Sequence, residues 1–491
     1  MRYILKLHFF ILICFFLGCR KTTNSKESKA LEEQEVYTEP EFVIDGIYGT
    51  STAIPLFDNH AINVLDGNTN TSWKTIKGAG PKEGIMVYFN KPIYIKKINI
   101  TQPKGQAITQ VTQFDVYANG KIHTTENINS TVEALFIGIK EVNAADVNTN
   151  TFKTGIYNNA KGSNTTFSPT LSVAISKIDF FNNSGNKIDF VIPKLVKASI
   201  KASSTLTPEV AYSVANLFDC KKDFGWAENA SSNGIGESIL INTDAPITYN
   251  KIKVWNGYQR SPKHFDANGS VKKLHLTNNV QLDEVLDLKN IKDPQAYYIK
   301  NRKSTTTLKL TLDNIYQGQK YEDVLMSEIR LYEKNIPIIL LSSDAEQVVK
   351  NNQGEKVSSS IMAYILDKNI QVDYTKREAV EDTFLNQSKE TSFILRSNNS
   401  FVMYTSESQG YEKDKAYNES QTIADGNWEL ISKNEEAIKV RIFGRIYDVF
   451  NGVDPYKGKG RKESIKIFKD IVTITKDAIE GEKFIDQIQL R

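Results

Sequence analysis

Hydrophobic and polar residues alternate with a period of two in many short segments of the chain, and Asn, Gly, Asp and Pro interrupt these segments. The pattern is typical of antiparallel sheets with one buried face. The clearest segments before residue 335 are 85–89, 93–100, 114–117, 238–241, 251–255 and 274–277. Many Thr, Asn, Ile and Val residues, together with 10% aromatic residues, also favour strands over helices. We therefore predict an all-β fold.

Two parts of the chain repeat each other. Residues 63–73 (NVLDGNTNTSW) and 216–226 (NLFDCKKDFGW) have Asn, Asp and Trp at the same spacing. After a loop, both copies continue with a Glu, an alternating segment, a Pro, a Lys-Ile pair and finally a Ser-x-Ile motif, in the same order. A match of this length indicates two homologous domains, 41–195 and 196–335. Alternating segments in domains of this size predict a sandwich or jelly roll.

The order of these motifs resembles that of discoidin domains, also called coagulation-factor type C domains, which have a galactose-binding-like fold. In the second copy, 233–237 (NGIGE), 252–258 (IKVWNGY), Asn268 and 272–274 (KKL) are similar to the NADase-type glycan-binding domain. Ser270 stands where that family tends to have Arg, and the first copy lacks the Asn-Gly-Tyr turn. The resemblance implies two tandem galactose-binding-like jelly-roll sandwiches that bind a ligand, and it implies no catalytic activity.

A ligand site is expected on the loops of the second copy. Sugars bind to flat aromatic faces together with a few polar groups on loops. The predicted ligand-binding rim consists of Trp226, Glu228, Tyr258, Arg260 and His264. The alternative is a structural loop, with Trp73 and Trp226 packed in equivalent cores.

The resemblance also implies candidate metal ligands, because Ca²⁺ often clips the loop around the early Asp of discoidin-like domains. Ca²⁺ binds oxygen ligands. The candidates are Asp66, Asn68 and Thr71 in the first copy and Asp219 and Glu328 in the second. Lys177 replaces the Glu in the first copy, and two Lys residues follow Asp219 in the second. The alternative is that both Asp residues organise turns. No other cofactor is expected.

The segment 336–491 does not repeat the earlier pattern. Its alternating segments are expected to form hairpins: two strands in 391–404 around 397–400, a pair at 426–431 and 437–447, and two strands in 463–475 separated by Lys469-Asp470. Consecutive strands joined by short polar turns predict a C-terminal antiparallel β-meander or small barrel. The Gly-Asn-Trp at 426–428 is similar to lipocalin-like barrels. The basic loop 452–462 is a solvated turn or a contact for an anionic partner.

The N-terminus has the pattern of an export signal. Two positive charges precede an apolar run from Leu7 to Leu17, and Gly18 and Cys19 follow. The run is too short to span a bilayer, which takes about 20 residues. Residues 16–19 (FLGC) resemble the lipobox of bacterial lipoproteins, although Phe16 and Leu17 are not the commonest residues there. The resemblance implies a signal peptide at 1–18 and lipidation of Cys19. Ordinary secretion and an uncleaved anchor are the alternatives.

Residues 19–40 are polar and charged, and they are expected to form a disordered tether. After cleavage only Cys19 and Cys220 remain, so no intrachain disulfide can form once Cys19 is acylated. The folded domains must therefore be stabilised by their hydrophobic cores.

The composition argues against several functions. A net charge of +3 with interspersed Lys and Glu gives no basic face for nucleic acid. The five His residues show no metal-binding spacing, and no phosphate-binding loop is found. We expect a non-catalytic, membrane-anchored lipoprotein of the bacterial cell envelope, facing the periplasm or the cell surface, that binds a glycan or protein. The alternatives are a hydrolase with paired carboxylates in or next to the C-terminal domain and a purely structural envelope protein.

Overall fold

The computed structural model describes residues 41–489, apart from gaps at 78–82, 106–107, 144–146, 153–155, 158–159, 170–171, 208, 232, 301–302, 382, 412–416, 455–457, 476–477 and 482–487. Cys19, the predicted signal peptide and the predicted tether lie outside the described residues. None of the helices in the described part of the chain is long and apolar enough to cross a membrane.

The first repeat consists of three small sheets around one core, with strand orders β1-β3-β8-β6-β7, β2-β12-β5 and β13-β4. Its strands are β1 (Ile44–Gly49), β2 (Trp73–Lys74), β3 (Gly84–Ile95), β4 (Lys97–Thr101), β5 (Ile108–Thr109), β6 (Val111–Ala118), β7 (Lys121–His123), β8 (Ser130–Val142), β12 (Ser172–Ile175) and β13 (Lys177–Phe181). The short 3-10 helix η1 (Ala61–Val64) precedes β2. Alternate residues of β3 and β8, such as Ile85, Val87, Leu135 and Ile137, point into the core.

The second repeat forms a single sheet with the order β19-β18-β21-β16-β14-β23-β22-β17-β20. The strands are β14 (Lys194–Ala202), β15 (Trp226–Ala227), β16 (Ser238–Ile247), β17 (Lys251–Asn256), β18 (Gly269–Asn278), β19 (Asp283–Asp287), β20 (Gln295–Tyr298), β21 (Thr305–Tyr316), β22 (Val324–Glu333) and β23 (Ile336–Ser342). Helices α1 (Glu209–Tyr212), η3 (Val214–Leu217) and α2 (Pro262–Ala267) lie in its loops. A short parallel pairing of β18 with β22 closes six strands into a ring. The segment 336–491 begins with β23, and this strand lies in the sheet of the second repeat, between β14 and β22.

The tryptophans of the two repeats make the same hydrogen bond. Trp73 and Trp226 are both fully buried. The Nε1 of Trp73 donates to the carbonyl of Ser51, and that of Trp226 donates to the carbonyl of Ser204, each at 2.9 Å. The equal spacing of these residues in the sequence therefore reflects an equivalent packing role.

The Asn and Asp of the repeated motif are also equivalent. The side-chain amide of Asn63 donates to two backbone carbonyls at 2.7 and 3.3 Å, and that of Asn216 donates to two at 3.2 Å. Asp66 and Asp219 each accept a hydrogen bond from the backbone N–H two residues later, at 2.7 and 2.8 Å. The motif thus closes the same turn in both copies.

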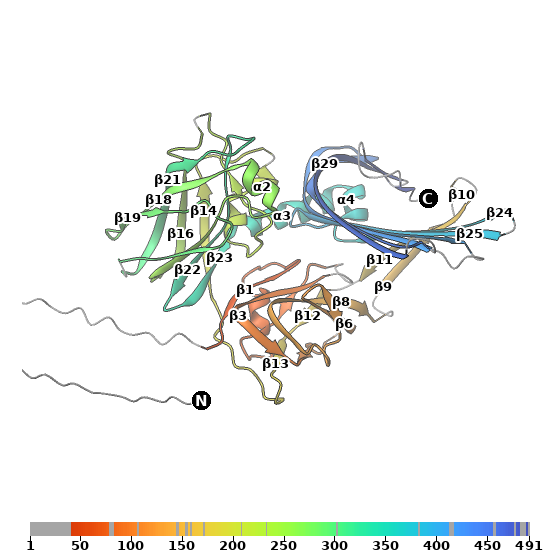
Figure 1. The fold of residues 1–491 in the computed structure, drawn as a ribbon, viewed down its shortest axis with the longest axis horizontal. Helices are drawn as coiled ribbons and strands as arrows, with labels where there is room; N and C mark the ends of the chain where they lie inside the picture. Colours follow the sequence, from red (N-terminus) through yellow and green to blue (C-terminus); the bar gives the residue numbers. More distant parts are fainter. Residues whose placement is uncertain are drawn as a thin grey trace, which may run out of the picture. The chain divides into compact units, whose positions relative to one another are not determined.

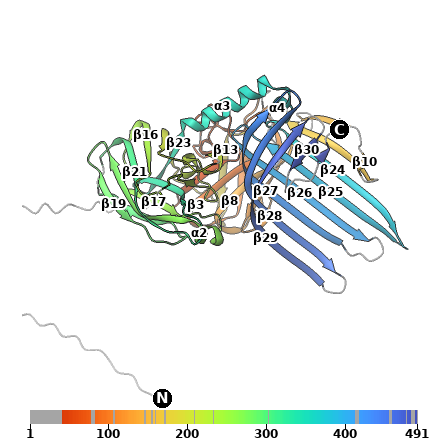
Figure 2. The same cartoon turned by 90° about the horizontal axis from the view of Figure 1, so that it is seen from above.

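The C-terminal part is an antiparallel meander of long strands with two helices on one face (Figures 1 and 2). Its elements are α3 (Ser343–Ser358), α4 (Ser360–Ile365), β24 (Asn369–Val380), β25 (Thr383–Leu395), β26 (Ser400–Tyr411), β27 (Tyr417–Lys433), β28 (Ala437–Asp454), β29 (Gly458–Thr475), β30 (Ala478–Gly481) and β31 (Ile488–Gln489). Apolar side chains of α4, including Ile361 and Ile365, pack against Phe393, Trp428 and Ile442 of the strands. The predicted all-β fold class is confirmed, and the meander is an open half-barrel.

Strands of the first repeat extend this meander. β9 (Val147–Phe152), β10 (Ile156–Tyr157) and β11 (Ala160–Pro169) lie in the C-terminal sheet, where β11 pairs with β24 from Lys161↔Thr375 to Phe167↔Asn369. This exchange is not predictable from local patterns, because an alternating segment does not specify the strand with which it pairs.

The expected break at Lys469-Asp470 is wrong. β29 continues through both residues, and Asp470 is paired with Ile442 of β28. Pairing with β28 along the whole strand maintains the extended backbone, which overrides the polar interruption.

Candidate functional site

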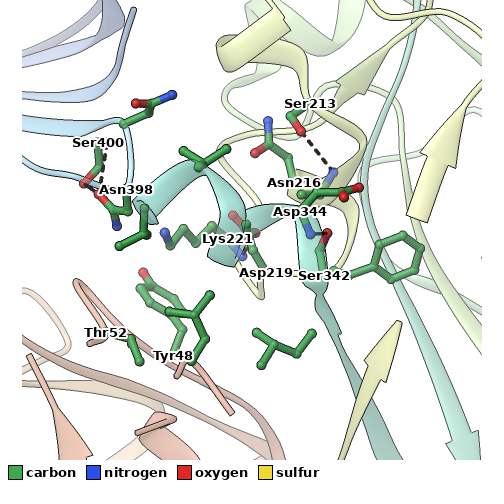
Figure 3. A pocket seen from close by; sticks show the side chains of 18 of the residues that line it. Tyr48, Thr52, Ser213, Asn216, Asp219, Lys221, Ser342, Asp344, Asn398 and Ser400 are labelled. Carbon is green, nitrogen blue, oxygen red and sulfur yellow. Dashed lines mark hydrogen bonds between the residues drawn. The ribbon is translucent and has the colours of Figure 1, made fainter. Parts of the chain in front are cut away.

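One candidate site is a pocket of about 550 Å³ to which four parts of the chain contribute. Its walls come from residues 47–60, 209–221, 339–349, and the turn 398–400 with 427–429 (Figure 3). This volume lies within the range of about 300–1,000 Å³ that is usual for small-ligand sites.

The lining of the pocket combines polar and apolar side chains. Amide, hydroxyl and phenol groups come from Tyr48, Thr52, Ser213, Asn216, Ser342, Asn398, Asn399, Ser400 and Asn427 (Figure 3). Apolar side chains come from Leu56, Phe218, Ile339 and Val348. Such a lining can offer hydrogen bonds to a polyhydroxylated ligand and apolar contact to its carbon skeleton.

Local hydrogen bonds fix the wall from the second repeat. Ser213 is the N-cap of η3, and its side chain accepts a hydrogen bond from the backbone N–H of Ala215. Asn216, which is 9% exposed, is held by its two carbonyl contacts. Cys220 adopts a positive φ of 64° at the end of the loop. The side chains of this wall are therefore positioned before a ligand binds.

The wall from the C-terminal sheet is a tight turn between β25 and β26. Asn398 Oδ1 accepts hydrogen bonds from the backbone N–H of Ser400 at 3.1 Å and from its hydroxyl at 2.6 Å. Asn399 lies in the left-handed region with φ of 62°, which Asn tolerates better than most residues. Just beside this turn, Arg396 forms a buried ion pair with Glu83 of the first repeat at 2.7 Å.

The charges on the pocket wall are mostly negative. Glu209, Asp219 and Asp344 contribute carboxylates, whereas Lys221 contributes an ammonium group whose Nζ lies 5.2 Å from the ring centroid of Tyr48. Burial raises the pKa of Asp219 to about 6, although the charge of Lys221 opposes this shift.

His60 on the pocket wall should make folding sensitive to pH. Burial lowers its pKa to about 4 from an ordinary 6.5, because the interior disfavours the charged ring. The neutral ring therefore contributes fully to the free energy of unfolding above pH 6.5. As the pH falls from 6.5 to about 4, this free energy decreases by roughly 3 kcal/mol. Urea unfolding of the wild type at several pH values should reveal this loss.

The control is His60→Ser. His60 Nδ1 accepts from the backbone N–H of Ile62 as the N-cap of η1, and Ser213 makes the same cap in the second repeat. The variant should keep the cap and show a clearly smaller loss of stability between pH 4 and 6.5, where the remaining loss comes from groups such as His264. An unchanged slope in that window would refute the assignment to His60.

Two predicted rim residues lie in the interior and not on an exposed rim. Trp226 is fully buried in the core. The carboxylate of Glu228 accepts from the backbone N–H of Val324 at 3.0 Å and of Ala230 at 2.6 Å. A Cβ on Gly234 would lie 2.9 Å from this carboxylate, which explains the glycine in the Asn233-Gly234 motif. Glu228 therefore connects the loop after β15 to the start of β22.

The other three rim residues lie together. Arg260 Nη1 donates to Tyr258 Oη at 2.9 Å, and the rings of Tyr258 and His264 are 5.5 Å apart. The guanidinium group also lies against the rings of Phe224 and Phe443 at 5.2 and 5.7 Å. Tyr258 and Arg260 are 3% and 6% exposed, so this cluster is covered by its neighbours. Within the described residues, Nε and Nη2 of Arg260 have no hydrogen-bond partner.

His264 is half-buried beside this cluster. Burial, together with the charges of Arg260 and Lys263, lowers its pKa to about 4. The ring is therefore neutral at physiological pH and can donate or accept a hydrogen bond.

The candidate calcium ligands of the first repeat form a turn. Asp66 Oδ2 accepts from the hydroxyl of Thr71 at 2.6 Å, and the same hydroxyl contacts the carbonyl of Asn68 at 2.8 Å. Lys177, at the expected Glu position, pairs with Asp179 at 2.9 Å.

In the second repeat, Glu328 is 1% exposed and binds Arg330 at 3.0 Å. Burial raises its pKa to about 8, and the nearby charge of Asp219 contributes. Among the described residues, no group of three or more His, Cys, Asp or Glu side chains could hold a metal ion. Calcium binding stays a prediction.

Sequence reasoning missed most of the pocket. Tyr48, Asp344, Asn398 and Ser400 lie on segments far apart in sequence, and none belongs to a recognisable motif. Asp219 was the one predicted residue on the pocket wall, where it had been proposed as a metal ligand.

A comparison with solved structures gives matches of low TM-score that include carbohydrate-binding modules. The family 32 module of Clostridium perfringens NanJ, solved with galactose, is 13% identical, and the match covers 28% of this chain and 93% of that one with a TM-score of 0.23. The CBM32-1 and CBM32-2 domains of C. perfringens ZmpB are 11% identical over 59% and 92% of the two chains, with a TM-score of 0.22. An F5/8 type C domain from Bacteroides fragilis is 16% identical over 28% and 91%, with a TM-score of 0.22.

A comparison with curated proteins finds no match to this sequence. One family model does match: that of the NAD glycohydrolase translocation F5/8 type C domain, over residues 193–332. The resemblance predicted for the second repeat is therefore confirmed, since residues 193–332 are similar to this family model.

Proposed function

We propose that the protein binds carbohydrate in the pocket lined by Tyr48, Asn216, Asp344, Asn398 and Ser400, without catalysing a reaction. The observation that carries the proposal is the pocket itself, whose volume and mixed lining suit a sugar. The F5/8 type C match supports it, because the wall 209–221 belongs to the matched residues 193–332.

The chemistry of the lining favours a sugar over an apolar ligand. Each hydroxyl of a sugar both donates and accepts, and an amide or hydroxyl side chain can meet either requirement. Hydrocarbon side chains of the lining, such as Leu56 and Ile339, can cover the C–H faces of the rings. An apolar ligand would leave the polar groups of the pocket desolvated and unpaired, at about 1–3 kcal/mol for each group.

Filling the pocket should abolish binding. Ala345 lines the pocket on α3, so Ala345→Trp places an indole inside it. Titration calorimetry of the full chain with oligosaccharides selected on a glycan array should show at least about ten-fold weaker affinity, a loss of roughly 1.4 kcal/mol. The matched control is Gln347→Trp, which adds the same side chain to an exposed position of α3. Wild-type affinity in Ala345→Trp would exclude the pocket as the site.

The hydrolase alternative makes a different prediction for the same samples. A binding protein should leave the bound oligosaccharide intact after prolonged incubation, whereas a hydrolase would shorten it. Chromatography of the recovered sugar separates the two functions.

We also propose that the chain is exported and anchored in the envelope by a lipid on Cys19. The apolar run and the lipobox-like residues 16–19 support this proposal. Mass spectrometry of the mature N-terminus should find a diacylglyceryl group on Cys19, and an unmodified thiol there would refute the anchor.

A further inference from the structure

Three carboxylates on the pocket wall come from separate elements. Glu209 lies on α1, Asp219 follows η3, and Asp344 lies in the first turn of α3. None of them takes part in an ion pair within the described part of the chain. The pocket therefore has unneutralised negative charge next to its amide and hydroxyl groups.

Lys221 is the lysine on the pocket wall, and its charge partly offsets that of Asp219. The ammonium group of Lys221 lies over the ring of Tyr48, and a fourth lining carboxylate, Glu429, is paired with Arg441. Lys350, on the same helix as Asp344, pairs with Glu346. With one lysine against three carboxylates, the pocket favours a ligand that brings a positive charge.

We propose that the ligand of this pocket is an amino sugar with a free, protonated amine. The inference rests on the proposed carbohydrate-binding function and names the substrate class of that same site. An ammonium group offers three donors and no acceptor, and carboxylates offer only acceptors, so the two are complementary. Charge-assisted hydrogen bonds of this kind are roughly twice as strong as neutral ones.

N-acetylation provides a sharp comparison. An acetylated amine keeps the sugar ring and its hydroxyls, but it loses the charge and two of the donors. The pocket should therefore distinguish a glucosamine oligomer from the corresponding N-acetylglucosamine oligomer. This preference should weaken with added salt, because salt screens the attraction.

The test is calorimetric titration of the full chain with the glucosamine hexamer and with the N-acetylglucosamine hexamer near pH 6.5. The wild type should bind the glucosamine hexamer at least ten-fold more tightly. Asp344→Asn keeps the size of the side chain and removes one charge, so it should cut affinity for the glucosamine hexamer about ten-fold and leave the acetylated hexamer within two-fold.

The control is Asp244→Asn, which removes the same charge from an exposed strand position outside the pocket. It should change neither affinity by more than two-fold. Asp219→Asn is a second pocket variant, and it should act in the same direction as Asp344→Asn.

The outcomes separate the inference from the function on which it rests. Equal affinity for the two hexamers, or equal loss for both in Asp344→Asn, overturns the inference while carbohydrate binding stands. Failure of every oligosaccharide to bind overturns the proposed function, and the inference with it. Tight binding of Ca²⁺ alone that Asp219→Asn abolishes assigns the negative charge to a metal and also overturns the inference.

Discussion

Arg330→Met is expected to lower the free energy of unfolding by about 3–5 kcal/mol, because it leaves buried Glu328 without its counter-charge and Asp45 with Lys253 alone. Arg330 is 3% exposed and donates to Asp45 through the carbonyl at 2.6 Å and through Oδ2 at 2.8 Å. Its other Nη binds Glu328, and its guanidinium stacks 4.9 Å from the ring centroid of Trp255. Asp45 also accepts from the hydroxyl of Tyr332 at 2.7 Å.

The network connects the two repeats, since Asp45 lies on β1 and Arg330 on β22. Burial opposes the ionisation of Asp45, but Arg330 and Lys253 hold its pKa below the ordinary value. The contribution of this carboxylate to stability is therefore present above its unfolded pKa and is lost as the pH falls through its folded pKa. Urea unfolding followed by tryptophan fluorescence measures the loss.

The double variant Arg330→Met with Asp45→Asn is the control. Removing the partner charge should recover part of the stability, since the strong penalty comes from an unpaired buried carboxylate and not from the absence of the pair. A double variant less stable than the sum of the two single losses would show that the ion pair is not the source.

Trp226→Ala is expected to destabilise the second repeat by about 3–5 kcal/mol, the usual cost of a large aromatic-to-alanine change in a core. The indole is fully buried, and its Nε1 hydrogen bond to Ser204 would also be lost. Thermal unfolding should show the fall. Trp73→Ala should have a comparable effect in the first repeat, because the two tryptophans are equivalent.

Trp226→Phe separates packing from ligand contact. Phenylalanine retains most of the buried area, so the loss of stability should be smaller than in Trp226→Ala. Below the unfolding transition, oligosaccharide affinity should stay within two-fold of the wild type. Loss of affinity in a folded Trp226→Phe variant would restore Trp226 as a ligand contact.

Local patterns predicted the strands and the repeat, but not the arrangement in space. Segments 85–89, 251–255 and 391–404 lie in observed strands or hairpins, because alternation directly records which face is buried. The Trp spacing revealed two equivalent cores. The same reasoning placed Trp226 and Glu228 on a rim, because a loop position does not reveal whether its side chain faces the core.

The pocket was beyond sequence reasoning for a different reason. Its residues come from both repeats, α3 and the β25–β26 turn, and each is an ordinary polar residue in its own segment. Asn398, for example, reads as a turn residue, and its structure confirms that role. Its place on a pocket wall depends on tertiary contacts that no local pattern encodes.

The pairing of β11 with β24 has a consequence for the order of events during synthesis. Lys161 meets Thr375 across more than two hundred residues of intervening chain, and Glu83 meets Arg396 across an even longer stretch. The second repeat has a core of its own and can form as soon as it emerges. The first repeat also has a core of its own, but one edge of β11 stays unpaired until β24 arrives, and an unpaired edge is a site of aggregation. The chain therefore needs its C-terminal third to complete its N-terminal third, and truncation at the C-terminus would leave the first repeat with an open edge.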